Sequence, residues 1–145
     1  YWHWFFLIRP APLPETLIEA DPECYLRSVM GSRSAGLTPF TEPAFGEYLR
    51  CLQRPGSARG ICEDYRASAS IDLEHDRADI AAGHHLDLPL RVLWGAQGTV
   101  GRCFDPLKEL QHVATNVSGK ALPAGHYLAE EVPELLLAEA LDFLR

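Results

Sequence analysis

A histidine near the end of the chain has the sequence context of a general base. His126 follows Gly125 within residues 124–134, a segment that predicts the end of a strand, a tight turn and the start of a helix. Gly125 can adopt backbone angles that a side chain would forbid, which would place His126 on the rim where the strand stops. An imidazole titrates near neutral pH and could accept a proton there. A histidine on a turn also commonly has a structural role, so the local pattern leaves both interpretations open.

The segments around His126 predict a parallel α/β arrangement. The patterns indicate strands over residues 88–95 and 117–122, a loop over 96–103, and helices over 105–113 and 133–145. Strand, helix, strand and helix in this order form the repeating unit of a parallel sheet. Two parallel strands need further strands beside them, because such sheets are buried on both faces. We therefore expect the sequence to be a fragment, with more strands upstream of Tyr1.

Residues 1–87 show short helical patterns separated by proline and glycine. Helices are predicted over residues 1–8, 14–20, 22–30, 41–53 and 57–70, with a loop over 31–38. The charged run 72–79 either extends the last of these helices or begins another that ends at Gly83. The sequence thus predicts two regions, a helical one over 1–87 and a strand-helix-strand-helix one over 88–145.

The composition excludes several classes of function. The chain has 145 residues, of which 47% are hydrophobic, and its 13 basic and 20 acidic residues give a net charge of -7. No basic cluster interleaved with aromatic residues is present, so a nucleic-acid partner is not expected. The apolar run 1–8 is too short to span a membrane, and it lacks the basic segment of a signal peptide. A cytoplasmic protein without a membrane partner is the expectation.

The four cysteines and the remaining histidines give no metal or redox signal. The cysteines are widely spaced without a C-x-x-C pair, so reduced thiols are predicted rather than a zinc site; they are Cys24, Cys51, Cys62 and Cys103. The pair His84-His85 lacks a third ligand at useful spacing. The acidic segment around His75 is interpreted as a solvated face or as a fixed contact between the helical region and the strand-containing region. Asp105 precedes Pro106 and is interpreted as a helix cap. No metal and no organic cofactor are expected.

Longer motifs resemble one enzyme family. Residues 88–145, with Gly125-His126 and Pro133, resemble the last two strand-helix units of an α/β-hydrolase. Residues 1–87 resemble the helical cap of the haloacetate and fluoroacetate dehalogenases. The motifs of this cap are YWHWFFL over 1–7, PAPLPE over 10–15, CEDYRA over 62–67 and DLEHD over 72–76. The resemblance implies the α/β class, as the C-terminal part of an α/β-hydrolase fold with an inserted helical cap.

The resemblance also implies a mechanism and site residues. In the family an aspartate displaces halide from a 2-haloacid to form an ester, and a histidine, here His126, activates the water that hydrolyses the ester. By the same resemblance His3, Trp4 and Tyr65 hold the leaving halide. The chain contains no Gly-x-Asp-x-Gly or Gly-x-Ser-x-Gly elbow. The 145 residues alone are therefore expected not to turn over substrate.

The three cap residues suit this chemistry. Fluoride is a poor leaving group, so several fixed donors in a dry pocket are needed to stabilise its developing charge. An imidazole, an indole N–H and a phenol each offer such a donor. Packing in the core of the cap is the alternative role for His3, Trp4 and Tyr65.

Alternative functions and partners remain open from the sequence. A soluble epoxide hydrolase uses the same scaffold with cap tyrosines that donate to the epoxide oxygen, and a non-catalytic binding relative would keep the cap without the chemistry. The expected substrate is a small 2-haloacid, fluoroacetate or chloroacetate. A homodimer is an assembly that the sequence leaves open.

Overall fold

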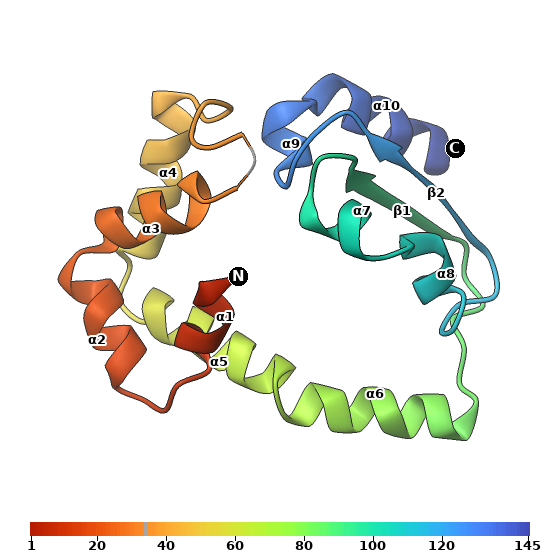
Figure 1. Ribbon diagram of the computed structural model, residues 1–145, viewed down its shortest axis with the longest axis horizontal. Coiled ribbons are helices and arrows are strands. Elements are labelled where there is room, and N and C mark those ends of the chain that lie inside the picture. The colour runs from red at the N-terminus through yellow and green to blue at the C-terminus, as the bar shows by residue number, and fades with distance from the viewer. Residues whose placement is uncertain (34) are drawn as a thin grey trace. The chain divides into compact units, whose positions relative to one another are not determined.

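A computed structural model describes residues 1–33 and 35–145. Ser34, which belongs to the loop predicted over 31–38, lies outside the described residues. The chain divides into two compact units (Figure 1). The helical unit comprises Tyr1–Ser32 and Phe40–Ala78, and the sheet unit comprises Arg33–Pro39 and Asp79–Arg145.

The helical unit consists of short helices that begin where the sequence places prolines and caps. Its helices are α1 (Trp2–Leu7), α2 (Leu13–Ala20), α3 (Pro22–Gly31), α4 (Glu42–Leu52) and α5 (Ser57–Ser68), and α6 (Ile71–Ala82) runs from this unit into the other. The Asp21 side chain accepts the N–H of Cys24 at 2.9 Å and so caps α3. Thr41 caps α4 in the same way through Ala44. The predicted helices are confirmed, and the charged run forms a separate helix, α6, whose residues are exposed.

The core of the helical unit lies where α5 packs against α1, α2 and α4. Its buried residues come from all four helices; they are Leu7, Ile18, Leu52, Ala58 and Cys62. Cys62 is fully buried, and burial raises the pKa of its thiol to about 11. This thiol therefore stays protonated near neutral pH and acts as a small apolar side chain.

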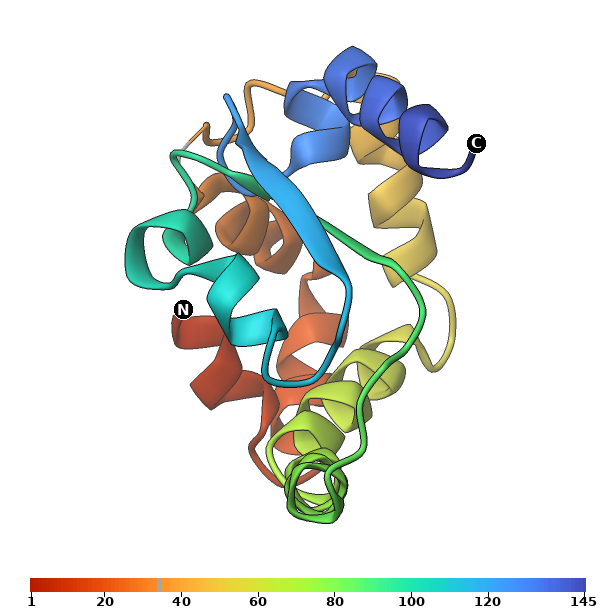
Figure 2. The ribbon, with the colours of Figure 1, turned by 90° about the vertical axis from the view of Figure 1, so that its right-hand side faces the viewer.

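The sheet unit contains two parallel strands joined by a helical crossover. Strand β1 (Leu90–Gly95) pairs with β2 (Val117–Leu122) in a continuous register from Leu90 opposite Val117 to Gly95 opposite Leu122. The helices of this unit are α7 (Thr99–Cys103), α8 (Pro106–Leu110), α9 (Leu128–Glu131) and α10 (Pro133–Phe143). Helices α7 and α8 lie on one side of the strand pair, and α9 and α10 lie on the other (Figure 1 and Figure 2). The predicted parallel strand-helix-strand-helix order is confirmed.

Two details of the sheet unit differ from the sequence prediction. The segment 96–103 was predicted as a loop, but Thr99–Cys103 forms α7. Gly101 lies so close to Trp94 of β1 that an added Cβ would be 2.9 Å from Trp94 Cδ1, which shows how tightly α7 packs on the strand. Packing on a neighbouring strand, rather than a periodic apolar pattern, therefore accounts for this helix.

An ionic network fastens α10 to both strands. The Glu139 carboxylate accepts from Arg91 of β1 at 3.0 Å and from Lys120 of β2 at 2.6 Å. The Lys120 ammonium and the Arg91 guanidinium hold the pKa of Glu139 below its ordinary value. Helix α10, the second helix after the His126 turn, is thus anchored to the strands that precede the turn.

The state of the cysteines and the length of the helices bear on two further expectations from the sequence. All four cysteines are free thiols, as the sequence predicted. Within the described residues, no helix has the length and apolarity that crossing a membrane requires.

Candidate functional site

His126 lies at the carboxyl end of the parallel strand pair. The loop after β1 and the loop after β2 are joined by backbone hydrogen bonds, from Ala96 to the Leu122 carbonyl at 2.8 Å and from Gln97 to the Ala124 carbonyl at 3.0 Å. The carboxyl ends of parallel strands are where α/β sheets commonly bind ligands. The imidazole of His126 is exposed at this edge of the sheet unit, with the Tyr127 ring packed edge-on at 4.9 Å between centroids.

The glycine before His126 acts differently from the sequence prediction. Among the described residues, positive φ angles occur at Gly36, Gly56 and Gly83 and not at Gly125, so the predicted special backbone angle of Gly125 was wrong. The close approach is instead made possible by Gly95 at the end of β1. A Cβ on Gly95 would lie 1.7 Å from the Gly125 carbonyl oxygen. The His126 turn is therefore placed by the absence of a side chain on the neighbouring strand.

A carboxylate holds the backbone on both sides of His126. Glu131, the last residue of α9, accepts the Gly125 N–H at 2.6 Å through Oε2 and the Tyr127 N–H at 3.0 Å through Oε1. Sequence reasoning missed this residue because α9 was not predicted. An acidic residue that follows a turn histidine within one short helix is the signal that could have indicated it.

The environment of His126 favours the neutral imidazole. Partial desolvation is the largest cause of a lowered pKa, the positive charge of Arg33 lowers it further, and the negative charge of Glu131 opposes both. A pKa below the ordinary value of about 6.5 leaves the ring neutral at pH 7 and able to accept a proton.

The helical unit brings His3, Trp4 and Tyr65 together. The Tyr65 ring of α5 lies edge-on to both rings of α1, with centroids 5.9 Å from His3 and 4.9 Å from Trp4. His3 is only 3% exposed, whereas Trp4 is 41% exposed. Tyr65 also packs against the core cluster, so this side chain contributes to the packing of the helical unit. Tyr65 lies 61 positions after Trp4 in the sequence, yet the three residues form one aromatic cluster.

A buried ion pair beside the aromatic cluster was also missed from the sequence. Arg66, the residue after Tyr65, contacts the Glu15 carboxylate of α2 at 2.7 Å and donates to the Arg9 carbonyl at 2.7 and 2.9 Å. Glu15 is buried. Arg66 thereby ties α5 to the segment that follows α1 and to the start of α2, which fixes the helices that carry the three aromatic residues.

This pair makes the helical unit sensitive to acid. Burial would raise the pKa of Glu15, but hydrogen bonding and the Arg66 charge outweigh it and hold the pKa below its ordinary value. The stabilisation is therefore complete above the unfolded pKa of about 4.5 and is lost as pH falls through the folded value. We expect Glu15→Gln to reduce the drop in Tm between about pH 7 and about pH 3. Glu19→Gln, on the exposed side of α2, is the matched control, and an unchanged drop in Glu15→Gln would contradict this account.

The other candidates from the sequence have structural roles or are exposed. The Asp105 side chain accepts the Lys108 N–H and caps α8, as predicted. His75 is exposed on α6, and His84 pairs with Asp79 at 2.9 Å. Among the described residues, no group of three His, Cys, Asp or Glu side chains could hold a metal ion.

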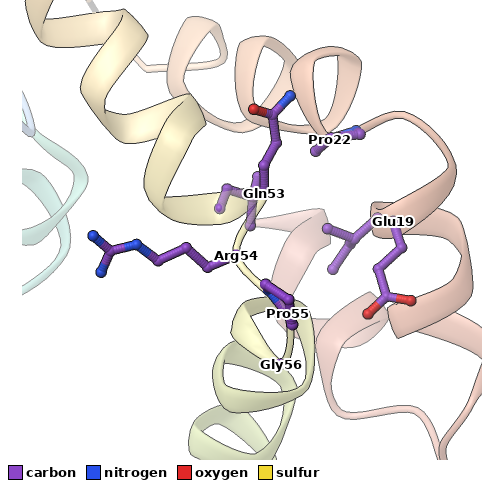
Figure 3. A pocket seen from close by; sticks show the side chains of 8 residues that line it. Glu19, Pro22, Gln53, Arg54, Pro55 and Gly56 are labelled. Carbon is purple, nitrogen blue, oxygen red and sulfur yellow. The ribbon is translucent and has the colours of Figure 1, made fainter.

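A hollow in the helical unit lies apart from the aromatic cluster. It has a volume of about 400 Å³ between the α2–α3 junction and the α4–α5 turn, and none of the candidate residues lines it. Figure 3 shows Arg54 extending away from Glu19, with Pro55 and Gly56 between the helices. The charged groups of Arg54 and Glu19 point away from each other, so they do not converge on a ligand in this hollow. The hollow therefore adds nothing to the candidate site.

Known proteins resemble this chain over nearly its whole length. No protein-family model matches it. The chain is 33% identical to a fluoroacetate dehalogenase from Burkholderia sp over 135 residues, which is 92% of the chain and 44% of that protein. It is also 33% identical to a soluble epoxide hydrolase from Corynebacterium sp. (strain C12), over 97% of the chain and 48% of that protein. The chain thus spans about half the length of the curated relatives it matches.

A solved structure decides the fold. The crystal structure of a protein from Nostoc sp PCC 7120 assigned as an α/β hydrolase is 46% identical to the chain, with a TM-score of 0.91 over 99% of the chain and 49% of that protein. The chain has the fold of the C-terminal part of an α/β-hydrolase. Its parallel strands β1 and β2 form the sheet of this part, and helices α7 to α10 flank the strands. The fold class predicted from the sequence is confirmed, and the homologues are α/β-hydrolases.

Proposed function

We propose that residues 88–145 supply the water-activating histidine, and residues 1–87 the cap, of a hydrolase that releases halide from a 2-haloacid such as fluoroacetate. The observation that carries the proposal is the cluster of His3, Trp4 and Tyr65, three residues with N–H or O–H donors on adjoining helices. The fluoroacetate dehalogenase relative supports it. In the whole protein these donors would stabilise the halide as it leaves.

The proposed reaction has two steps. An aspartate from another segment of the whole protein attacks the carbon that bears the halogen, and the carbon–halogen bond breaks with its electron pair on the halide. His126 then takes a proton from water, and the resulting hydroxide adds to the carbonyl of the aspartyl ester. The ester bond breaks, the departing alkoxide takes a proton from the His126 imidazolium and leaves as a 2-hydroxy acid, and the aspartate carboxyl loses its proton to solvent. The lowered pKa of His126 suits its role as the base in the second step.

Removal of one of the three proposed halide-binding donors tests the proposal. In the whole protein, Trp4→Phe is expected to lower fluoride release from fluoroacetate by about 10²-fold, the cost of losing one donor to a developing anion. Trp2→Phe is the matched control, because Trp2 lies on the same helix and packs on Phe6 and Tyr25. Fluoride is measured with an ion-selective electrode. Equal losses in the two variants would contradict a specific role for Trp4.

The epoxide hydrolase relative favours a second candidate function. An epoxide hydrolase would also use the Tyr65 phenol, which could donate to the epoxide oxygen, and His126 would again hydrolyse an ester. Assay of the whole protein with both substrates separates the two functions. Halide release without diol formation from a terminal epoxide supports the first, and diol formation without halide release supports the second.

A further inference from the structure

Three hydrogen bonds close the segment 125–131 onto itself. The Glu131 carboxylate accepts the N–H of Gly125 at 2.6 Å and that of Tyr127 at 3.0 Å. The backbone N–H of Glu131 donates to the Tyr127 carbonyl at 2.8 Å. His126 therefore lies between two amides held by one side chain, and the residue carrying that side chain is fixed to the same turn.

This arrangement requires a carboxylate rather than a generic polar group. Both oxygens of an ionised glutamate are acceptors, so each can take one N–H. A glutamine at position 131 would offer one acceptor oxygen, and its NH₂ group would face the other backbone N–H. Hydrogen bonds to an ionised acceptor are also shorter and stronger than neutral ones, in keeping with the 2.6 Å contact.

We propose that Glu131 is a positioning residue for the general base: it fixes the backbone on either side of His126 and so sets the direction of the imidazole toward the reacting water. This inference rests on the proposed role of His126 in ester hydrolysis. Glu131 acts through the histidine and need not touch the substrate.

The charge of Glu131 provides a second effect that can be measured separately. The charged groups that act on the imidazole are Arg33, which lowers its pKa, and Glu131, which raises it, while the Tyr127 ring packs against it. Removal of the Glu131 charge should therefore lower the pKa of His126 further. A group that only stabilised the fold would leave this pKa unchanged.

The test compares Glu131→Gln, Glu131→Asp and Glu134→Gln in the whole protein. Glu134 is an exposed acid in the first turn of α10 and serves as the matched control. We expect Glu131→Gln to lower kcat by about 10-fold to 100-fold, with the ester intermediate accumulating and KM little changed. The acid limb of the pH profile of kcat should move to lower pH. An NMR titration of the His126 ring, identified by its loss in His126→Gln, should show the same shift without any substrate.

Glu131→Asp separates charge from geometry. It keeps the negative charge on a shorter side chain, so we expect a lower kcat with a His126 titration closer to that of the unaltered protein. This variant also keeps the test decisive if Glu131→Gln fails to fold. A wild-type kcat and titration in Glu131→Gln, alongside an inactive His126→Gln, would overturn the role of Glu131 and leave the proposed function standing. Unimpaired turnover in His126→Gln would overturn the proposed function, and the NMR titration would still report on Glu131.

Discussion

Replacement of His126 by glutamine in the whole protein is expected to slow release of the 2-hydroxy acid by about 10²-fold to 10⁴-fold, the usual contribution of a general base. The first equivalent of halide should still be released, because the attack of the aspartate precedes the step that needs the histidine. Each active site would then hold its ester intermediate. Mass spectrometry of the quenched protein should find the aspartate-containing peptide heavier by the carboxymethyl group that fluoroacetate leaves on the aspartate.

A second histidine in the sheet unit provides the control. His112 is exposed in the turn that follows α8, and His112→Gln should leave turnover unchanged. A burst of halide that equals the protein concentration, followed by a slow phase, would be the kinetic sign of a blocked second step. Steady turnover at the unaltered rate by His126→Gln would contradict the role proposed for the histidine.

The fold of this chain could be predicted largely because its signals are local. Prolines and capping side chains such as Asp21 and Thr41 mark the starts of helices, and their effects act within one turn. The apolar run that becomes β1 and the turn that follows β2 are also local patterns. Helix α7 could not be predicted in this way, because its five residues are held by packing against Trp94 rather than by their own periodicity.

The candidate site depends on contacts that local patterns do not encode. His3 and Trp4 meet Tyr65 only because α1 packs on α5, and the family resemblance, not the spacing, grouped them. Arg66 was part of a recognised motif, but its pairing with Glu15 depends on how two helices meet. At the His126 turn, the sequence pattern predicted that an unusual backbone conformation of Gly125 places the histidine. In the structure, the missing side chain of Gly95, 30 positions earlier at the end of β1, makes the close approach possible.

Substitution of Gly95 is the second change for which we expect a large effect. Gly95→Ala should destabilise the protein by at least about 3 kcal/mol, because the new Cβ would lie 1.7 Å from the Gly125 carbonyl oxygen and 2.5 Å from that of Ala124. Both contacts are to backbone, so no side-chain rotation can relieve them. Urea unfolding followed by circular dichroism measures the change. Gly46→Ala is the matched control, since a Cβ there meets nothing within 4 Å on an exposed part of α4, and it should stabilise the protein by up to about 1 kcal/mol.

Gly98→Ala is a milder variant that relates the close contact between the end of β1 and the His126 turn to the proposed chemistry. A Cβ at Gly98 would lie 2.9 Å from the Gly125 carbonyl oxygen and 3.2 Å from that of Gly95, so the backbone must shift there too, although by less than at Gly95. Gly98→Ala should therefore lose less stability than Gly95→Ala while displacing the backbone next to His126. Because a displaced base transfers protons less efficiently, we expect its rate of ester hydrolysis to fall by about 10-fold or more. If Gly98→Ala kept full activity, or Gly95→Ala kept full stability, the close contact between the two strand ends would not be what places His126.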